Sequence, residues 1–286
     1  MRAPSRRVGG AALLLVLWLI VLLTALVGGF AMVARVERLQ GQVLVRGLAT
    51  HGAARAGIEY ALTRVAHADP RLRWQPNGQP YSWQYNGAEI EIRIVDENGK
   101  IDLNQADPQL LSNLLLALGT DQADAPRLAA AVLDWRDPDQ LTQPAGGAED
   151  RDYASAGRAY GAKDAQFESI AELQQVLGIT PDLYARIEPH VTVHSSLPRP
   201  DPAFASAPVL DAIGLDGAGL VSARGQADPA IAAPGAFGSG TYSIDSLARL
   251  ADGRQSLLRV VVRAGGNGVP GMAYTALRWE EGASPR

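Results

Sequence analysis

The chain has 286 residues, of which 47% are hydrophobic and 20% are charged, and its net charge is -4. This length fits one large domain or two smaller ones. The acidic balance argues against general nucleic-acid binding, which needs a basic surface to neutralise phosphates. Because cysteine is absent, the chain has no disulfide, cysteine nucleophile or thiolate metal site.

An uncharged apolar segment, residues 8–34, lies between Arg2, Arg6 and Arg7 on one side and Arg35 on the other. At about 1.5 Å per residue it reaches roughly 40 Å, enough to cross a hydrocarbon core of about 30 Å. The apolar region of a cleaved secretory signal is shorter, about 7 to 15 residues. The segment therefore predicts a retained membrane span, and the three leading arginines predict a cytoplasmic N-terminus with the remainder outside.

The helical pattern continues beyond the span until Pro70, which is a stop signal. Apolar residues recur there at steps of three and four, as on one face of a helix. They are Val36, Leu39, Val43, Ala54, Ile58, Ala61, Leu62 and Val65. We therefore expect one long helix with its first half in lipid and an amphipathic second half.

Residues 81–104 change from helical periodicity to the alternation of a half-buried strand, seen most clearly in residues 88–95 (AEIEIRIV). Asn86 and Gly87 form a strong hairpin signal, and residues 97–99 supply a second turn. This stretch predicts a small antiparallel meander.

Helical patterns return between residues 106 and 189. Each of several segments begins at a recognisable start signal, such as Asp107-Pro108, Thr180-Pro181 or the capping box of Ser169 and Glu172. Four helices are expected, at 109–119, 127–137, 167–178 and 182–189.

After residue 189 the sequence predicts a short strand, a Pro-rich extended connection and then further strands. These strands comprise residues 241–244 and two more joined by a Gly-rich turn. Strands on both sides of a helical block predict a helical domain inserted in a sheet.

Residues 136–153 (RDPDQLTQPAGGAEDRDY) place five carboxylates around a Pro/Gly-rich loop without Lys or His. Calcium prefers six to eight oxygen ligands from a loop that can curl around the ion. An exposed loop would accommodate the same residues. Acid-base catalysis would need two carboxyl groups with separated pKa values in a pocket, which nothing nearby indicates. The residues alone leave these three interpretations open.

The arginine-bearing leader, the glycine before a long apolar helix and the small sheet resemble the type IV pilin-like plan. The segments DENGKIDLNQA, AVLDWRDPD, GGAEDRDY and ELQQVLGITPDLYARIEPHVTV resemble the general secretion pathway protein K family, the minor pseudopilin K of type II secretion. The resemblance implies an α+β fold: a long transmembrane and amphipathic helix packed on a small antiparallel sheet, with a large, mostly helical domain inserted in the sheet.

The implied organisation divides the chain into six parts. They are a leader (1–10), the transmembrane part of the long helix (11–34), its periplasmic part (35–69), the first part of the sheet (70–105), the inserted helical domain (106–189), and a connection with the second part of the sheet (190–286).

The resemblance also implies processing by prepilin peptidase after Gly10, with Gly9 as the alternative bond, and N-methylation of Ala11. Most pseudopilins have Glu at the fifth mature position, where this chain has Leu15. In the pilin design that Glu pairs with the amino terminus of the preceding subunit, because an unpaired carboxylate in the membrane is costly. A subunit without it suits the tip of the fibre.

The implied function is non-enzymatic: a tip pseudopilin that initiates or caps the pseudopilus. Its expected partners are minor pseudopilins I, J and H, prepilin peptidase and the inner membrane, and no nucleic acid. The expected location is the inner membrane, single-pass, with the C-terminal domain in the periplasm. The family also implies a structural calcium ion, with ligands expected among Asp137, Asp139, Glu149, Asp150 and Asp152, while Asp134 is interpreted as a helix cap.

Two alternatives remain. IDLNQA with VLGITPDLYARI is similar to the helix-hairpin-helix motif of membrane-anchored, competence-like DNA-binding proteins, although the turn lacks its second glycine and Asp182 and Glu188 flank it. A membrane-tethered hydrolase that uses the acidic loop is the other.

Overall fold

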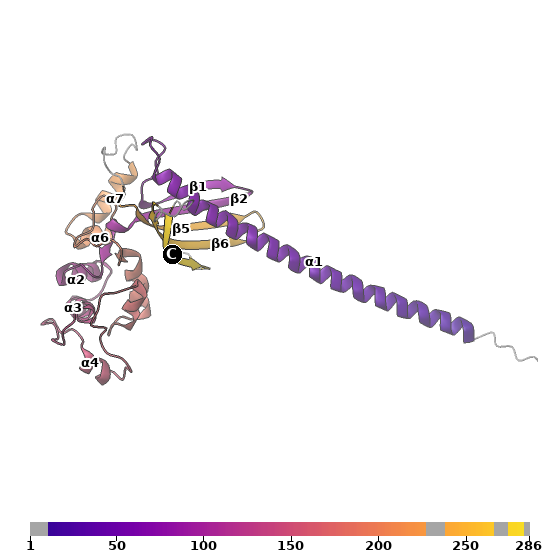
Figure 1. The fold of residues 1–286 in the computed structure, drawn as a ribbon, viewed down its shortest axis with the longest axis horizontal. Coiled ribbons are helices and arrows are strands. Elements are labelled where there is room, and N and C mark those ends of the chain that lie inside the picture. Colours follow the sequence, from indigo (N-terminus) through magenta and orange to yellow (C-terminus); the bar gives the residue numbers. More distant parts are fainter. Residues whose placement is uncertain (1–10, 227–237, 266–273, 283–286) are drawn as a thin grey trace, which may run out of the picture.

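A computed structural model describes residues 11–226, 238–265 and 274–282. Gly10 and the rest of the predicted leader lie outside the described residues. Helix α1 (Ala11–Val65) is continuous and projects far beyond the rest of the chain (Figure 1). It is long and apolar enough to cross a membrane. Its large apolar side chains from Leu13 to Leu48 that the structure describes are 47–72% exposed, as expected for a helix that is solvated by lipid or by other helices.

Five strands form one antiparallel sheet in the order β1-β2-β5-β6-β7. The predicted hairpin at Asn86 and Gly87 is confirmed, since both residues have positive φ angles, 49° and 77°, as a type I′ turn requires. The strands are β1 (Asn77–Tyr85), β2 (Ala88–Asp96), β5 (Thr241–Leu250), β6 (Gln255–Ala264) and β7 (Tyr274–Glu281).

The last third of α1 packs across this sheet. Ile58 on the helix and Ile90 and Ile92 on β2 are fully buried and belong to one apolar cluster. The helix comes very close to the sheet at Gly57, where a Cβ atom would lie 2.3 Å from the hydroxyl oxygen of Ser246. The amphipathic half of α1 therefore supplies one side of the core of the sheet domain.

Residues 97–226, between β2 and β5, form a second domain beside the sheet, at the end away from the free part of α1 (Figure 1). Its elements are η1 (Glu97–Gly99), β3 (Ile101–Asp102), α2 (Pro108–Ala117), α3 (Asp124–Arg136), α4 (Asp150–Ser155), η2 (Ile170–Gln175), α5 (Pro181–Ile187), η3 (Glu188–His190), β4 (Val191–Thr192), α6 (Ala207–Ala212) and α7 (Gly217–Gln226). The three elements labelled η are 3₁₀ helices.

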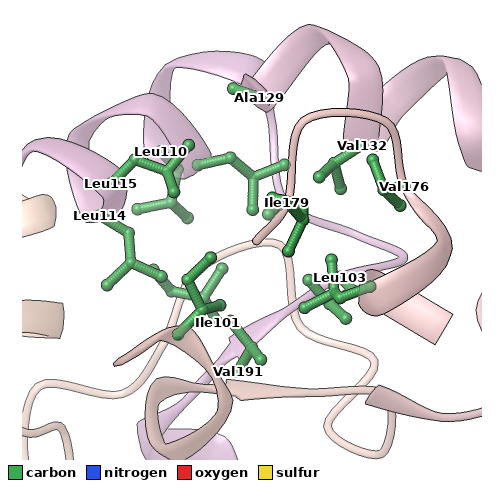
Figure 2. Close-up of a cluster of buried hydrophobic side chains, with 14 of the residues drawn as sticks. Ile101, Leu103, Leu110, Leu114, Leu115, Ala129, Val132, Val176, Ile179 and Val191 are labelled. Atoms are coloured by element: carbon green, nitrogen blue, oxygen red, sulfur yellow. The ribbon is translucent and has the colours of Figure 1, made fainter. Parts of the chain in front are cut away.

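Figure 2 shows the apolar core of this helical domain. Ile101 from β3 and Val191 from β4 lie beneath Leu114 of α2 and Val132 of α3. Local caps set where the helices begin: the Asp107 carboxylate accepts a hydrogen bond of 2.7 Å from Leu110 N at the start of α2.

Three expectations about the elements were wrong. Residues 101–102 leave the predicted meander, because β3 pairs in parallel with β4 in a separate two-stranded sheet. The capping box of Ser169 and Glu172 is present, but it starts the 3₁₀ helix η2 instead of an α-helix.

The segment predicted as connection and strands contains the third difference. It includes α6 and α7, so the insertion extends beyond residue 189. Helix α6 has only six residues, too few for a periodic signal, and it is stabilised by burying Val209 and Leu210 in the core of the helical domain.

Candidate metal centre

Three carboxylates converge where α3 ends and α4 begins. Asp134 lies in the last turns of α3, Asp137 is the residue that caps its C-terminus, and Glu149 is the N-cap residue of α4. One oxygen from each lies within 4.8 Å of the others. The loop between the two helices therefore folds back and brings Glu149 to the end of α3.

Several carboxylate oxygens at this site are buried and have no hydrogen-bond partner. They are Asp137 Oδ1, both oxygens of Glu149 and Asp164 Oδ1. Asp164 adopts a positive φ of 53°, in the left-handed region that residues with a Cβ rarely occupy. A buried ionised acceptor without a donor is costly, so this arrangement favours either protonation of a carboxylate or a positively charged partner.

The pKa values of these carboxyls also indicate a shortage of positive charge. Burial, followed by the charges of Asp134, Asp137 and Asp164, raises the pKa of Glu149 to about 7. Burial raises the pKa of Asp134 to about 6, although the Gln143 N–H donates to it. Each group therefore makes ionisation of the others less favourable.

The donor set fits a hard divalent cation. Calcium and magnesium both prefer oxygen ligands, and calcium accepts the irregular geometry that a loop provides. Asp139 lies at the rim: its charge acts on Glu149, while its Oδ1 accepts a hydrogen bond of 2.8 Å from Leu141 N. A Cβ atom at Gly147 would lie 1.9 Å from Asp134 Oδ2, so only glycine leaves room for this carboxylate.

The remaining predicted ligands, Asp150 and Asp152, make other contacts. Asp150 Oδ1 accepts a hydrogen bond of 3.1 Å from Ala162 N. Asp152 Oδ2 accepts one of 3.0 Å from Glu149 N, the N-cap residue of α4. Both carboxylates thus order α4 and the chain that follows it.

Asp134 and Asp164 were not among the metal ligands predicted from the sequence. Asp134, interpreted there as a helix cap, is fully buried in the cluster. Its spacing of three residues from Asp137 on the end of a helix was a local signal for a shared face. Asp164 had no such signal, because it is brought to the cluster only by the fold.

Aromatic side chains pack beside α3 and α4 at this site. Trp135 and Tyr153 are buried, with ring centroids 5.9 Å apart, and Tyr160 and Phe167 lie next to Trp135. The helix ends that supply the carboxylates are thereby anchored to the core of the helical domain.

Another buried carboxylate, Glu97, lies at the junction of the two domains. Its Oε1 is 2.6 Å from Lys100 Nζ and accepts a hydrogen bond of 2.5 Å from Ser243 on β5, and Thr192 on β4 donates to Oε2. Burial alone would raise the pKa of Glu97, but the Lys100 charge and these hydrogen bonds outweigh it and hold the pKa below its usual value. This network connects the sheet to the helical domain.

Comparison with known proteins finds similarity to one family. The family model described as "Type II secretion system (T2SS), protein K" matches residues 91–196. Type II secretion system protein K of Pectobacterium carotovorum subsp. carotovorum is 31% identical over 54% of this chain and 47% of its own length. The Pseudomonas aeruginosa protein of the same name is 32% identical over 62% of this chain and 53% of its own length. The chain thus spans about half the length of these relatives.

The fold also matches a solved structure, "The Crystal Structure of the GspK-GspI-GspJ complex from enterotoxigenic Escherichia coli Type 2 Secretion System". The TM-score is 0.58, with 86% of this chain and 100% of that chain covered, at 14% sequence identity. This likeness confirms the predicted pilin-like α+β fold. The family model and the two relatives confirm the resemblance to the type II secretion system protein K family, and residues 91–196 are the part of the chain that matches the family model.

Proposed function

We propose that this chain is a minor pseudopilin that lies at the tip of a type II secretion pseudopilus and initiates or caps the fibre. The observation that supports it best is the architecture of α1: an apolar span that continues into the helix of a pilin-like sheet domain. The helical domain beyond the sheet adds bulk at the end opposite the span (Figure 1), where a further subunit would have to sit. Leu15, in place of an acidic residue, removes the need for a neighbour above.

The proposed role is structural and non-enzymatic, in the inner membrane with the folded domains in the periplasm. Pseudopilins I and J are the proposed partners, since the similar structure is a complex of GspK with GspI and GspJ, and pseudopilin H is a further one. The exposed apolar face of α1 between Val36 and Leu48 suits packing against the helices of such partners. A direct test is co-purification: I and J should be retained by the full chain and lost when this face is made polar.

Processing by prepilin peptidase is part of the same proposal. Co-expression with the peptidase should shorten the chain by residues 1–10 and leave a methylated Ala11, which intact-mass spectrometry measures. Gly10→Val should block cleavage, whereas the matched change Gly9→Val should leave it intact. An unchanged N-terminal mass in the wild type would contradict a pseudopilin role.

Calcium is the proposed metal, held by Asp134, Asp137 and Glu149 with Asp164 and Asp139 beside them. When bound, the ion would supply the positive charge that these carboxylates lack and would join the end of α3 to the start of α4. Terbium, which occupies calcium sites, should luminesce on excitation of Trp135 and be displaced by calcium. Asp134→Asn should abolish this signal, and the exposed control Asp182→Asn should keep it.

The helix-hairpin-helix alternative would require salt-sensitive duplex binding. The second helix of that motif is α5, which contains Asp182, is followed by Glu188 and has Arg186 as its one basic residue. Submicromolar binding of duplex DNA would restore this alternative over the pseudopilin proposal.

A further inference from the structure

A cleft of about 400 Å³ lies on the other side of the loop that holds the metal cluster. Residues 146–148 form one wall, the first half of α3 forms another, and the turn at 177–180 with α5 closes the third. Its volume lies within the range of about 300 to 1,000 Å³ that is usual for ligand pockets. Nothing in the proposed structural role requires this space.

Glycines keep the cleft open. A Cβ atom at Gly178 would lie 2.7 Å from Leu128 Cδ2, and Gly119, Gly146 and Gly178 all adopt positive φ angles. A side chain at any of these positions would be strained, and at Gly178 it would also press on the lining of the cleft. The backbone therefore maintains a concave surface here.

The lining combines an apolar floor with polar groups that can still form hydrogen bonds. Leu128, Leu177 and Leu183 provide the floor. The hydroxyl of Thr120 is buried in the lining and has no hydrogen-bond partner. A buried hydroxyl without a partner is unusual in a folded protein, so this atom points to a ligand that supplies one.

Two guanidinium groups stand at the rim. Arg186 Nη1 donates to Leu118 O at 2.7 Å, and Arg127 Nη1 lies 3.2 Å from Asp124 Oδ1. Each guanidinium group has five N–H donors, so both arginines retain donors that could bind a carboxylate. Asp121 and Asp124 lie in the same lining, and their charges disfavour polyanions such as nucleic acid.

We propose that this cleft binds a peptide segment that presents an apolar side chain beside a carboxylate, and that the metal-bound loop is one of its walls. The apolar side chain lies on Leu128 and Leu183, and the carboxylate is held by Arg127 and Arg186. Gly147 connects the two sites, since it lines the cleft and packs against the Asp134 carboxylate of the metal cluster.

The test uses the full chain in detergent micelles with saturating calcium and two probes, N-acetyl-leucine and its uncharged analogue N-acetyl-leucinamide. Saturation-transfer NMR titrations give both affinities. The acid should bind saturably and the amide about tenfold more weakly, as expected for losing hydrogen bonds between charged groups. Equal affinities, or no binding of either probe, would overturn the proposal.

Variants locate the binding in the cleft. Arg127→Gln and Arg186→Gln should each weaken binding of the acid about tenfold, and the isosteric change Thr120→Val should weaken binding of both probes. Arg71→Gln, an exposed position outside the cleft, is the matched control and should change nothing. Circular dichroism checks that the variants are folded. If the folded cleft variants bind the acid as tightly as the wild type, binding does not occur in this cleft.

The shared wall is tested by removing calcium with EGTA. Affinity for the acid should fall because residues 146–148 lose the ion that anchors their neighbours. Terbium luminescence establishes separately whether metal is bound, so failure of the metal proposal is distinguishable from failure of the cleft. Equal affinity with bound and with removed metal would overturn the proposal that the metal holds this wall of the site.

Discussion

Glu97 and Glu149 are both buried glutamates, but their surroundings differ in one respect. Glu97 is fully buried and receives an ammonium group and two hydroxyls from its own chain. Glu149 is 4% exposed, has no hydrogen-bond partner on either oxygen and faces further carboxylates. Burial raises the free energy of an ionised carboxylate in both places. The chain compensates for it at the domain junction with Lys100, Ser243 and Thr192, whereas no described side chain donates to Glu149 at the candidate metal centre.

The largest expected effect on stability comes from removing the ammonium group of Lys100, the buried partner of Glu97. Lys100→Met should lower the free energy of unfolding by about 3–5 kcal/mol, because it leaves Glu97 buried without a partner. Arg46→Met is the control, since the pair of Arg46 with Asp252 is at the surface, the Arg46 side chain being 54% exposed, and should cost about 1 kcal/mol or less. Urea denaturation of both variants measures the difference. Similar losses would mean that the buried pair stabilises no more than a surface pair.

At the candidate metal centre, the effect of removing a carboxylate on the free energy of unfolding should depend on whether calcium is present. Without calcium, Glu149→Gln should raise the free energy of unfolding by roughly 1–3 kcal/mol, because it removes repulsion among the carboxylates. At a calcium concentration of about 100 times Kd, the wild type should gain about 2.7 kcal/mol that the variant lacks. Glu97→Gln should be destabilising with and without calcium. Denaturation curves in EGTA and in calcium test this, and a Glu149→Gln variant that is destabilised in EGTA would contradict the comparison.

A smaller loss of stability, together with the response to calcium, should distinguish acidic residues that bind the metal from those that cap a helix. Asp152→Ala should cost about 1 kcal/mol, because it removes the carboxylate that accepts from Glu149 N, but the calcium-induced rise in melting temperature should persist. Asp134→Asn should abolish that rise. If Asp152→Ala abolishes it instead, the cluster has been assigned to the wrong carboxylates.

The smallest difference is expected in pH dependence. The pKa of Glu97 is lower in the folded chain than its usual value of 4.5, so its contribution to stability is present above pH 4.5 and is lost as pH falls through the folded pKa. Glu97→Gln should therefore lose less stability than the wild type below pH 4.5. Both proteins are compared in EGTA, so that release of metal does not contribute. Parallel stability curves would mean that Glu97 is no better stabilised in the folded state than in the unfolded chain.

Much of the fold was predictable because its signals are local. The apolar span, the Asn86-Gly87 turn and the Asp107 cap each depend on residues close together in sequence. The elements that were missed depend on distant partners. Strand β3 has two residues and exists because it pairs with β4, about ninety positions later in the chain.

The candidate metal centre was predictable as a region but not as a set of ligands. The excess of carboxylates around Gly146 and Gly147 is visible in the sequence. Neighbours in that excess have opposite roles in the structure, since Glu149 lies in the cluster while Asp152 caps a helix. Composition cannot distinguish them, because the direction of each side chain depends on where the helix begins.

The sequence by itself determined the long apolar helix, the hairpin and the helix starts, because each follows from periodicity or turn chemistry over a few residues. Only the tertiary structure decided which carboxylates meet. Asp134 and Asp164 are thirty residues apart, yet their charges act on the same Glu149. It likewise decided which hydroxyls stabilise Glu97, because Thr192 on β4 reaches it only when the helical domain folds and Ser243 on β5 only when the two domains pack together.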